Sequence, residues 1–337
     1  MKKVIVTGGA GFIGSHTCVE LVTAGFEPVI VDDLRNSRER ALEGITRILG
    51  RMPSVHRIDC CDSARMEEVF RAEGPVHGVI HFAADKAVGE SVKEPVKYYR
   101  NNIGSLAVLL DLMARLGVTR IVFSSSCTVY GQPERLPVRE TAPDNNATSP
   151  YGFTKVVCER MVRDTSAADP ALKAVLLRYF NPIGAHPSAA IGELPLGVPN
   201  NLVPFVTQTA AGLRKQLTVF GDDYPTPDGS CIRDYIHVVD LARAHVRALQ
   251  WMEERTAPLC EVFNIGTGNG HSVFEVLRTF EAVNNTPVPH TVGPRRTGDT
   301  TEVYADTTRS REVLGWAPTL SLADALRDAW RWQQALM

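Results

Sequence analysis

A tyrosine and a lysine lie four residues apart in the stretch SPYGFTK, and together they could do acid–base chemistry. Pro150 favours the start of a helix, so Tyr151 and Lys155 should share one face of it, with Cβ atoms about 6 Å apart. In an arbitrary sequence such a pair is more often a half-buried ring beside a solvated lysine. Free tyrosine has a pKa of about 10 and is a poor base at neutral pH, so the chemistry depends on neighbouring residues.

A glycine-rich turn near the N-terminus, TGGAGFIGSH, follows an apolar run and opens a stretch with helical periodicity. Gly8 permits a tight turn, Gly11 lets a pyrophosphate approach the backbone, and Gly14 lets the helix pack closely on a sheet. Phosphates would then lie at the helix N-terminus, where free N–H groups and the helix dipole favour anions. The turn therefore predicts a bound dinucleotide.

Asp32 ends the second apolar run, where the dinucleotide fingerprint places an acidic residue. A carboxylate there can accept hydrogen bonds from both ribose hydroxyls and repels a 2′-phosphate, which predicts NAD rather than NADP. Arg35 and Arg38 lie close enough in the sequence to weaken that discrimination. In the alternative interpretation, Asp32 is only a turn residue at the end of a strand.

The elements that would position these residues alternate between short apolar runs and helical stretches. Repeated strand–helix–strand order implies right-handed crossovers and a parallel sheet covered on both faces. We therefore predict an α/β protein with a Rossmann-like doubly wound parallel sheet. The expected strands are 2–8, 27–33, 54–59, 77–83, 119–126 and 173–180. The expected helices are 13–24, 38–50, 63–72, 93–116 and 151–168.

The chain changes character after Asn181, where Pro, Gly and Ala become frequent. We expect a NAD-binding Rossmann domain over 1–180 and a smaller, loop-rich α/β lobe over 181–337 that binds the substrate. A segment near 234–265 is expected to pack back on the first domain. The expected elements of the lobe are a strand over 217–221 and helices near 202–214, 238–253, 271–283 and 321–335.

The composition excludes several classes of protein. The 337 residues are 44% hydrophobic and 22% charged, as in an ordinary globular protein. The net charge of −2 gives no electrostatic basis for binding nucleic acid or an acidic membrane, and no apolar run reaches the ~18 residues of a membrane span. The seven cysteines have no CxxC spacing, so we expect reduced thiols in a cytoplasmic protein without a metal site.

Taken together, the motifs resemble those of the UDP-glucose 4-epimerases (also called UDP-galactose 4-epimerases) of the extended short-chain dehydrogenase/reductase family. The resemblance runs in register from Lys3 to about Trp332. It rests on TGGAGFIGSH, HFAADKAVGES, FSSSCTVYG, SPYGFTK, LRYFNPIGAHPS, PNNLVPF and RDYIHVVDLARAH.

The resemblance implies a catalytic triad of Ser126, Tyr151 and Lys155. Tyr151 would take the proton of the sugar 4′-hydroxyl while C4 delivers hydride to tightly bound NAD, and Ser126 would hydrogen-bond the 4′ oxygen. The Lys155 charge and the positive nicotinamide would lower the tyrosine pKa. The 4-keto sugar would turn over in the cleft and take the hydride back on its other face, which interconverts UDP-glucose and UDP-galactose. A homodimer paired through helices 93–116 and 151–168 is also implied.

The same resemblance implies two sets of binding residues, and it makes the second lobe a nucleotide-sugar-binding lobe. Two arginines suit a diphosphate, because each guanidinium can pair with two phosphate oxygens. The NAD site would consist of Gly8, Gly11, Phe12, Ile13, Gly14, Asp32, Asp33, Asn36, Ser37, Asp59, Phe82, Ala83, Lys86, Asn101, Ser124, Tyr151, Lys155, Tyr179 and Phe180. The UDP-sugar site would consist of Ser126, Tyr151, Asn181, Asn201, Leu202, Phe220, Arg233, Arg296, Asp299 and Val303.

The sequence departs from the family pattern at three informative positions. Asp33 stands where Asn is usual and should strengthen the rejection of NADP. Asp85 is polar where Leu is usual, and the sequence offers no reason for it. Val303 stands where some members carry a bulky Tyr, so the pocket should have room for the 2-acetamido group of UDP-GlcNAc or UDP-GalNAc. In the alternative interpretation, Val303 only packs in the core.

Three alternatives stay open. A nucleotide-sugar 4,6-dehydratase shares the fold, NAD and the Tyr/Lys pair, but related dehydratases place an Asp-Glu pair where this chain has Cys127 and Thr128. Another NAD-dependent nucleotide-sugar epimerase or a decarboxylase would share the scaffold. A NAD-binding regulatory protein would use the fold without catalysis, although it would have little reason to keep the triad together with the sugar-site arginines.

Overall fold

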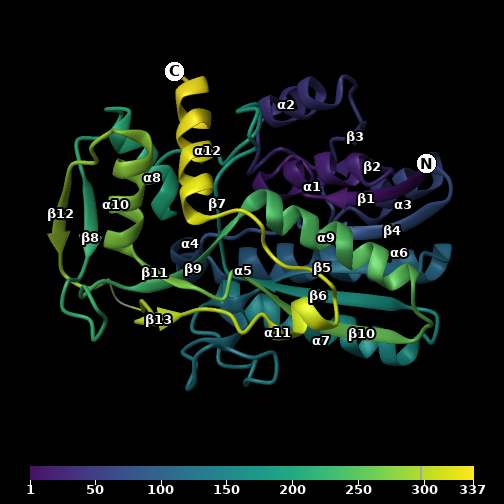
Figure 1. The fold of residues 1–337 in the computed structure, drawn as a ribbon. Coiled ribbons are helices and arrows are strands. Elements are labelled where there is room, and N and C mark those ends of the chain that lie inside the picture. Colours follow the sequence, from purple (N-terminus) through teal and green to yellow (C-terminus); the bar gives the residue numbers. More distant parts are fainter. Residues whose placement is uncertain (297) are drawn as a thin grey trace.

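The computed structural model describes residues 1–296 and 298–337. The larger part of the protein is built around a parallel sheet with helices on both faces (Figure 1). Within these residues the sheet has seven strands in the order β10-β6-β5-β4-β1-β2-β3, and every adjacent pair runs parallel. This topology confirms the predicted α/β doubly wound fold. The strands are β1 (Lys2–Thr7), β2 (Phe26–Val31), β3 (Ser54–His56), β4 (Val76–His81), β5 (Arg120–Ser126), β6 (Lys173–Tyr179) and β10 (Leu259–Ile265).

Side chains that alternate along each strand bury both faces of the sheet. In β1, Val4 and Val6 belong to the core beneath α1, α2 and α9, whereas Ile5 belongs to the core beneath α3, α6 and α7. The near-continuous apolar runs of the sequence therefore have helices on both sides, as parallel sheets require. These helices are α1 (Phe12–Thr23), α2 (Glu39–Leu49), α9 (Val238–Glu253), α3 (Ser63–Glu73), α6 (Gly104–Leu116) and α7 (Pro150–Ala168).

The single helix expected over 93–116 is wrong, because this segment is divided into several pieces. Pro95 has no N–H to continue a helix, and it forces Glu94 out of helical geometry (φ −127°, ψ 56°). A π-helical turn then adds a residue before α6, and such turns are frequent at functional sites. The pieces are α4 (Val88–Lys93), α5 (Pro95–Tyr98), the π-helical turn η1 (Tyr99–Ile103) and α6.

A smaller lobe with its own apolar core lies beside the sheet (Figure 1). The chain nevertheless returns to the first sheet, because α9 packs on α1 and β10 pairs with β6. The domain division at residue 180 stays a prediction. The lobe contains β7 (Asn181–Ile183), β9 (Ile232–His237), β11 (Gly270–Ser272), β13 (Glu302–Val303), β8 (Leu217–Phe220), β12 (His290–Gly293), α8 (Leu202–Ala210), α10 (Val273–Asn284) and α12 (Leu322–Ala335). Helix α11 (Thr308–Glu312) instead packs on β10 of the first sheet.

Helix α8 ends at Ala210, four residues before its expected end. Gly212 has a φ of +72° and donates its N–H to the Thr209 carbonyl, so the backbone turns there instead of continuing as a helix. The last turn of the expected helix thus becomes a connection to β8.

Candidate active site

The glycine-rich turn closes tightly between β1 and α1. Gly8 has a φ of +69° and donates its N–H to the Val31 carbonyl at 2.8 Å. A Cβ on Gly8 would lie 2.8 Å from the Ala83 nitrogen, and one on Gly14 would collide with the Gly8 carbonyl. A larger residue at Gly8 would push the turn away from the chain that follows β4, and one at Gly14 would push α1 away from the turn. The turn therefore leaves its backbone and the start of α1 open to a phosphate group.

Asp32 holds this turn to the end of β2. Its Oδ2 accepts a hydrogen bond from the Ala10 N–H at 3.0 Å, and its Oδ1 accepts from the Leu34 N–H at 2.9 Å and from the Ser37 hydroxyl at 2.8 Å. Burial raises the pKa of this carboxyl, while these three donors act to lower it. The carboxylate thus joins the glycine-rich turn to the segment that follows β2.

One cavity combines most of the cofactor residues expected from the sequence. Asp59, Ser124 and Phe180 lie outside its lining. The expected residues that line it are Gly8, Gly11, Phe12, Ile13, Gly14, Asp32, Asp33, Asn36, Ser37, Phe82, Ala83, Lys86, Asn101, Tyr151, Lys155 and Tyr179. The lining residues that sequence reasoning missed as cofactor contacts are Val31, Arg35, Ile58, Cys60, Ala84 and Ser105. Several of these flank an expected residue along the chain, which is the signal that could have found them.

The reaction end of the groove lies where β5 and β6 finish. Ser126 and Tyr179 are register partners at the carboxyl ends of these two strands. Helix α7 begins nearby, with the Ser149 hydroxyl accepting from the Gly152 N–H at 3.1 Å, and it brings Tyr151 and Lys155 into the same region. Strand carboxyl ends are where open parallel sheets bind ligands.

Burial dominates the electrostatics of the catalytic pair. Lys155 is 4% exposed, and its Nζ donates to the Ser124 carbonyl at 2.8 Å. Burial lowers the pKa of this ammonium to about 8. Burial also raises the pKa of Tyr151 well above its ordinary value; Tyr179 adds to the rise, and the Ser126 hydroxyl opposes it. Within the protein's own groups, burial outweighs the groups that lower the tyrosine pKa, and the lowering expected with a bound nicotinamide stays a prediction.

The residues of the groove fit a dinucleotide. The Gly8 and Gly14 positions leave no room for a side chain, and the open start of α1 offers N–H groups to phosphates. Asp32 lies at one end, where a ribose would need an acceptor, and Tyr151 with Lys155 lies at the other. The groove thus joins an adenosine end and a reaction end.

Three polar residues expected at the substrate site come together in the smaller lobe. Arg296 Nη2 donates to Asp299 Oδ1 at 2.6 Å, and Arg233 Nη2 lies 3.9 Å from the same oxygen. The Arg296 guanidinium is 5.8 Å from the centre of the Phe220 ring. The structure therefore brings Phe220, Arg233, Arg296 and Asp299 into one cluster, although they come from three separate segments of the sequence.

Glu193 connects the cofactor and substrate sides, and sequence reasoning missed it. Its Oε1 accepts from Asn201 Nδ2 at 2.6 Å and lies 3.6 Å from Lys86 Nζ. Leu202, the first residue of α8, is partly buried, and Asn181 is the first residue of β7. No family motif marked Glu193, because it joins Asn201, eight residues away, to Lys86 in a distant segment.

Val303 is 7% exposed and packs into a small apolar cluster. The cluster includes Phe180, from the strand end next to the reaction site, and Val129, three residues after Ser126. Val303 is thus a packed residue close to the catalytic strand ends, so packing alone does not decide between the two interpretations of this position.

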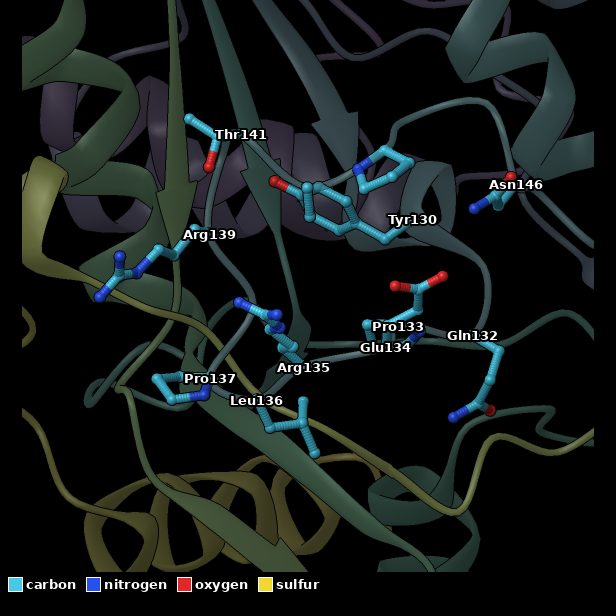
Figure 2. Close-up of a pocket in the computed structure, with 12 residues that line it drawn as sticks. Tyr130, Gln132, Pro133, Glu134, Arg135, Leu136, Pro137, Arg139, Thr141 and Asn146 are labelled. Carbon is cyan, nitrogen blue, oxygen red and sulfur yellow. The ribbon is translucent and has the colours of Figure 1, made fainter.

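A second cavity of about 510 Å³ lies outside the cofactor groove (Figure 2). Residues from Tyr130 to Asn146 line it, and Figure 2 shows Tyr130, Glu134 and Arg135 among them. Among the residues that the structure describes, none of those expected at either binding site belongs to its lining.

The described residues contain neither a membrane-spanning helix nor a cluster of metal ligands. Over 1–296 and 298–337, no helix combines the length and the apolar character needed to cross a membrane. The same residues contain no group of three or more His, Cys, Asp or Glu side chains placed to hold a metal ion.

Comparisons with known proteins place the chain among epimerases. Residues 4–266 match the model of the NAD dependent epimerase/dehydratase family. A UDP-glucose 4-epimerase of Bacillus subtilis is 48% identical over 332 residues, which is 98% of this chain and 97% of the relative.

Two solved structures agree with this assignment. The UDP-glucose-4-epimerase of Stenotrophomonas maltophila, with bound NAD and formylated UDP-arabinopyranose, has a TM-score of 0.96 and 48% identity over 100% of this chain and 99% of that one. The UDP-glucose 4-epimerase of Bifidobacterium longum, in complex with NAD+ and UDP, has a TM-score of 0.94 and 46% identity over 99% and 98%.

Proposed function

The chain belongs to the NAD dependent epimerase/dehydratase family, and from this premise we propose that it interconverts UDP-glucose and UDP-galactose as a UDP-glucose 4-epimerase. One observation carries the proposal: relatives and solved structures of that activity match it at nearly half identity over almost the whole chain. The enzyme is NAD-dependent. The placement of Ser126, Tyr151 and Lys155 at one end of the groove supports the proposed epimerase activity.

In the proposed mechanism, Tyr151 exchanges a proton with the sugar 4-hydroxyl. NAD, when bound, supplies the nicotinamide that takes up and returns hydride. Tyr151 Oη accepts the hydroxyl proton and later gives it back, as a general base and then a general acid. The Ser126 hydroxyl, at the end of β5, orients the same oxygen.

Lys155 lies beside this proton exchange in a buried position. Since burial raises the tyrosine pKa, the phenol keeps its proton until a positive charge lies near the ring. The nicotinamide of a bound oxidised cofactor would supply that charge, in addition to the Lys155 ammonium that is already part of the site. Proton removal would thus depend on the cofactor being bound and oxidised, which would prevent the base from acting without its redox partner.

The sugar nucleotide would be held mainly by the smaller lobe. Arg233 and Arg296 would pair with the diphosphate, and Asp299 would keep the two guanidinium groups near each other before the substrate arrives. Phe220 is 44% exposed and would stack on uracil.

We also propose that N-acetylated UDP-hexoses are substrates. Val303 supports this proposal because it is smaller than tyrosine and packs with Phe180 close to the reaction end. The Val303→Tyr variant should keep turnover of UDP-galactose and lose turnover of UDP-GlcNAc. The proposal fails if the wild-type protein leaves UDP-GlcNAc unchanged and Val303→Tyr makes no difference.

We propose a homodimer in the cytoplasm as the state of the enzyme. Exposed apolar side chains support the dimer: Val96 is 74% exposed and Phe153 is 43% exposed, and the Phe153 ring lies 6.5 Å from that of Tyr99. These side chains lie on α5, η1 and α7, in the regions expected to pair. Light scattering after gel filtration should give twice the monomer mass.

Separate incubation with UDP-glucose, UDP-galactose, UDP-GlcNAc and UDP-GalNAc tests the function. The enzyme should convert either member of a pair to the same equilibrium ratio without net consumption of NAD. A 4-keto-6-deoxy product would indicate a 4,6-dehydratase, and loss of carbon dioxide from a UDP-uronic acid would indicate a decarboxylase. Protein that holds NAD and leaves every UDP-sugar unchanged would favour a regulatory role.

A further inference from the structure

Two side chains of the β2–α2 connection reach across the adenosine end of the cofactor groove. Arg35 Nη2 donates to Asn101 Oδ1 at 2.7 Å, and Asn36 Nδ2 donates to Asp85 Oδ1 at 2.8 Å. Asp85 follows β4, and Asn101 lies in η1. Two hydrogen bonds therefore join one wall of the groove to the other.

The backbone between these walls has an unusual conformation. Leu34 has a φ of +62°, which a bulky side chain rarely adopts. Asp32 holds this conformation, because its Oδ1 accepts both the Leu34 N–H and the Ser37 hydroxyl. A strained residue persists only where the surroundings fix it, and such residues cluster at ligand sites. The conformation aims Arg35 and Asn36 toward the opposite wall.

Charge around Arg35 directs its guanidinium into this bridge. Its Nε lies 2.8 Å from Asp33 Oδ2, and its Nη2 lies 3.4 Å from Asp59 Oδ1. The guanidinium thus has carboxylate partners on both sides as well as Asn101.

The opposite wall is a buried polar cluster tied to the catalytic helix. The Asp85 N–H donates to Asn102 Oδ1 at 2.8 Å, and Asn102 Nδ2 donates to the Asp85 carbonyl at 3.0 Å and to Thr154 Oγ1 at 3.1 Å. The Thr154 hydroxyl donates to the Tyr151 carbonyl at 2.7 Å. Asp85 and Asn102 are each 2% exposed. The anchor for Asn36 is therefore rigid.

Asp85 is costly to keep at this position. Its Oδ2 is buried and has no hydrogen-bond partner among the residues that the structure describes. A buried carboxylate oxygen without a donor destabilises a fold, and a leucine would avoid that cost. The hydrogen bond from Asn36 to Asp85 Oδ1 is the interaction that a leucine at this position would not make.

We propose that residues 32–37 form a clasp over the adenosine end of the groove, closed by the Arg35–Asn101 and Asn36–Asp85 contacts, with Asp85 as a positioning residue that slows the release of NAD. The inference rests on the proposed NAD-dependent function and adds to it a reason for retention of the cofactor. Asp85 acts through Asn36, whereas Arg35 lines the groove itself.

The rate of cofactor release tests the clasp without reference to epimerase turnover. Protein loaded with NADH is mixed with excess NAD, and the decay of NADH fluorescence gives the dissociation rate constant. Arg35→Ala and Asn36→Ala should each release NADH about tenfold faster than the wild type, since each loses one hydrogen bond across the groove. Asp85→Leu should match Asn36→Ala, and Asp85→Asn, which keeps an acceptor, should stay close to the wild type.

Arg47→Ala is the matched control, since Arg47 is an exposed arginine on the adjacent α2. Release rates within twofold of the wild type for both Arg35→Ala and Asn36→Ala would overturn the clasp, as would equal acceleration in Arg47→Ala. Because Asp85 is buried, Asp85→Leu could fail to fold, and Asp85→Ala then removes the same contact; Asn36→Ala alone does not isolate it, since Asn36 also lines the groove. Wild-type protein that holds no NADH would instead contradict the proposed function.

Discussion

At the adenosine end of the groove, Asp33, Arg35 and Asp59 are charged, solvent-accessible and joined by ion pairs. At the reaction end, Tyr151 and Lys155 are nearly excluded from solvent, and the Lys155 ammonium has a backbone carbonyl as its partner. Residues of both ends line the same cavity. The adenosine end is built with exposed charge pairs, whereas the reaction end is built with groups buried away from solvent.

This difference in burial corresponds to a difference in role: the adenosine end holds the cofactor, and the reaction end acts on the substrate. Exposed charge pairs contribute little individually and are screened by salt, so an end built from them is adjustable and tolerant of change. Burial changes which protonation state a group prefers, so an end built from buried groups is sensitive to the loss of any one. Substitutions should therefore have larger effects at the reaction end than at the adenosine end.

The largest effect is expected for Tyr151→Phe at the reaction end. Removal of the hydroxyl removes the general base, so kcat for UDP-galactose should fall by about 10²–10⁴-fold. The NAD content of the purified variant should equal that of the wild type, because the ring and the adenosine end remain. Preserved turnover would refute the role assigned to Tyr151.

The next effect concerns the free energy of unfolding of cofactor-free protein in Lys155→Met. Lys155 has a folded pKa of about 8 against the ordinary lysine pKa of 10.5, so between these pH values the unfolded state binds more protons and wild-type stability rises with pH. Lys155→Met should lack this rise. Its advantage in stability over the wild type at pH 7 should shrink by about 3 kcal/mol by pH 10.5. Urea unfolding across this range measures the gap, and a constant gap would contradict a buried lysine with a lowered pKa.

Asp32→Ala should have an intermediate effect, confined to cofactor binding. The variant loses the acceptor for the Ala10 and Leu34 N–H groups and for the ribose. The NAD dissociation constant should rise at least tenfold, since each lost contact is worth about 1 kcal/mol. At saturating NAD, kcat should stay within a few-fold of the wild type. An equal loss in kcat would show that the two ends are not separable.

The smallest effect is expected for Asp33→Asn, which removes one exposed charge. The ion pair with Arg35 is accessible to solvent, so the free-energy change should be within about 1 kcal/mol. The NAD release rate should rise less than about fivefold, and 0.5 M salt should reduce the difference between variant and wild type. A larger change would mean that the adenosine end depends on charge as strongly as the reaction end depends on burial.

Sequence patterns predicted the scaffold better than the details of its elements. The unbroken apolar run of Val4, Ile5 and Val6 marked a strand buried on both faces, and β1 has that form. The helix expected over 93–116 failed because the pattern does not register a π-helical turn or the effect of Pro95 on Glu94. Both features are local, but the spacing of apolar residues in this segment is the same as in an uninterrupted helix, so the pattern does not reveal them.

The candidate site shows the same limit in another form. Motif resemblance named Asn36 and Asn101 as cofactor residues, and both line the groove. It gave no role to Arg35 or Asp85, because each acts through a partner about 50 residues or more away in the chain.

By itself, the sequence determined the features that depend on short spacing: the glycine turn, the short apolar runs that form strands, and the single helical face shared by Tyr151 and Lys155. Only the tertiary structure decided how those groups behave. It raised the tyrosine pKa, lowered the lysine pKa, and joined Arg35 to Asn101 across the groove. The physical reason is that backbone geometry is set by neighbouring residues, whereas solvent exclusion and long-range partners arise only when distant segments pack together.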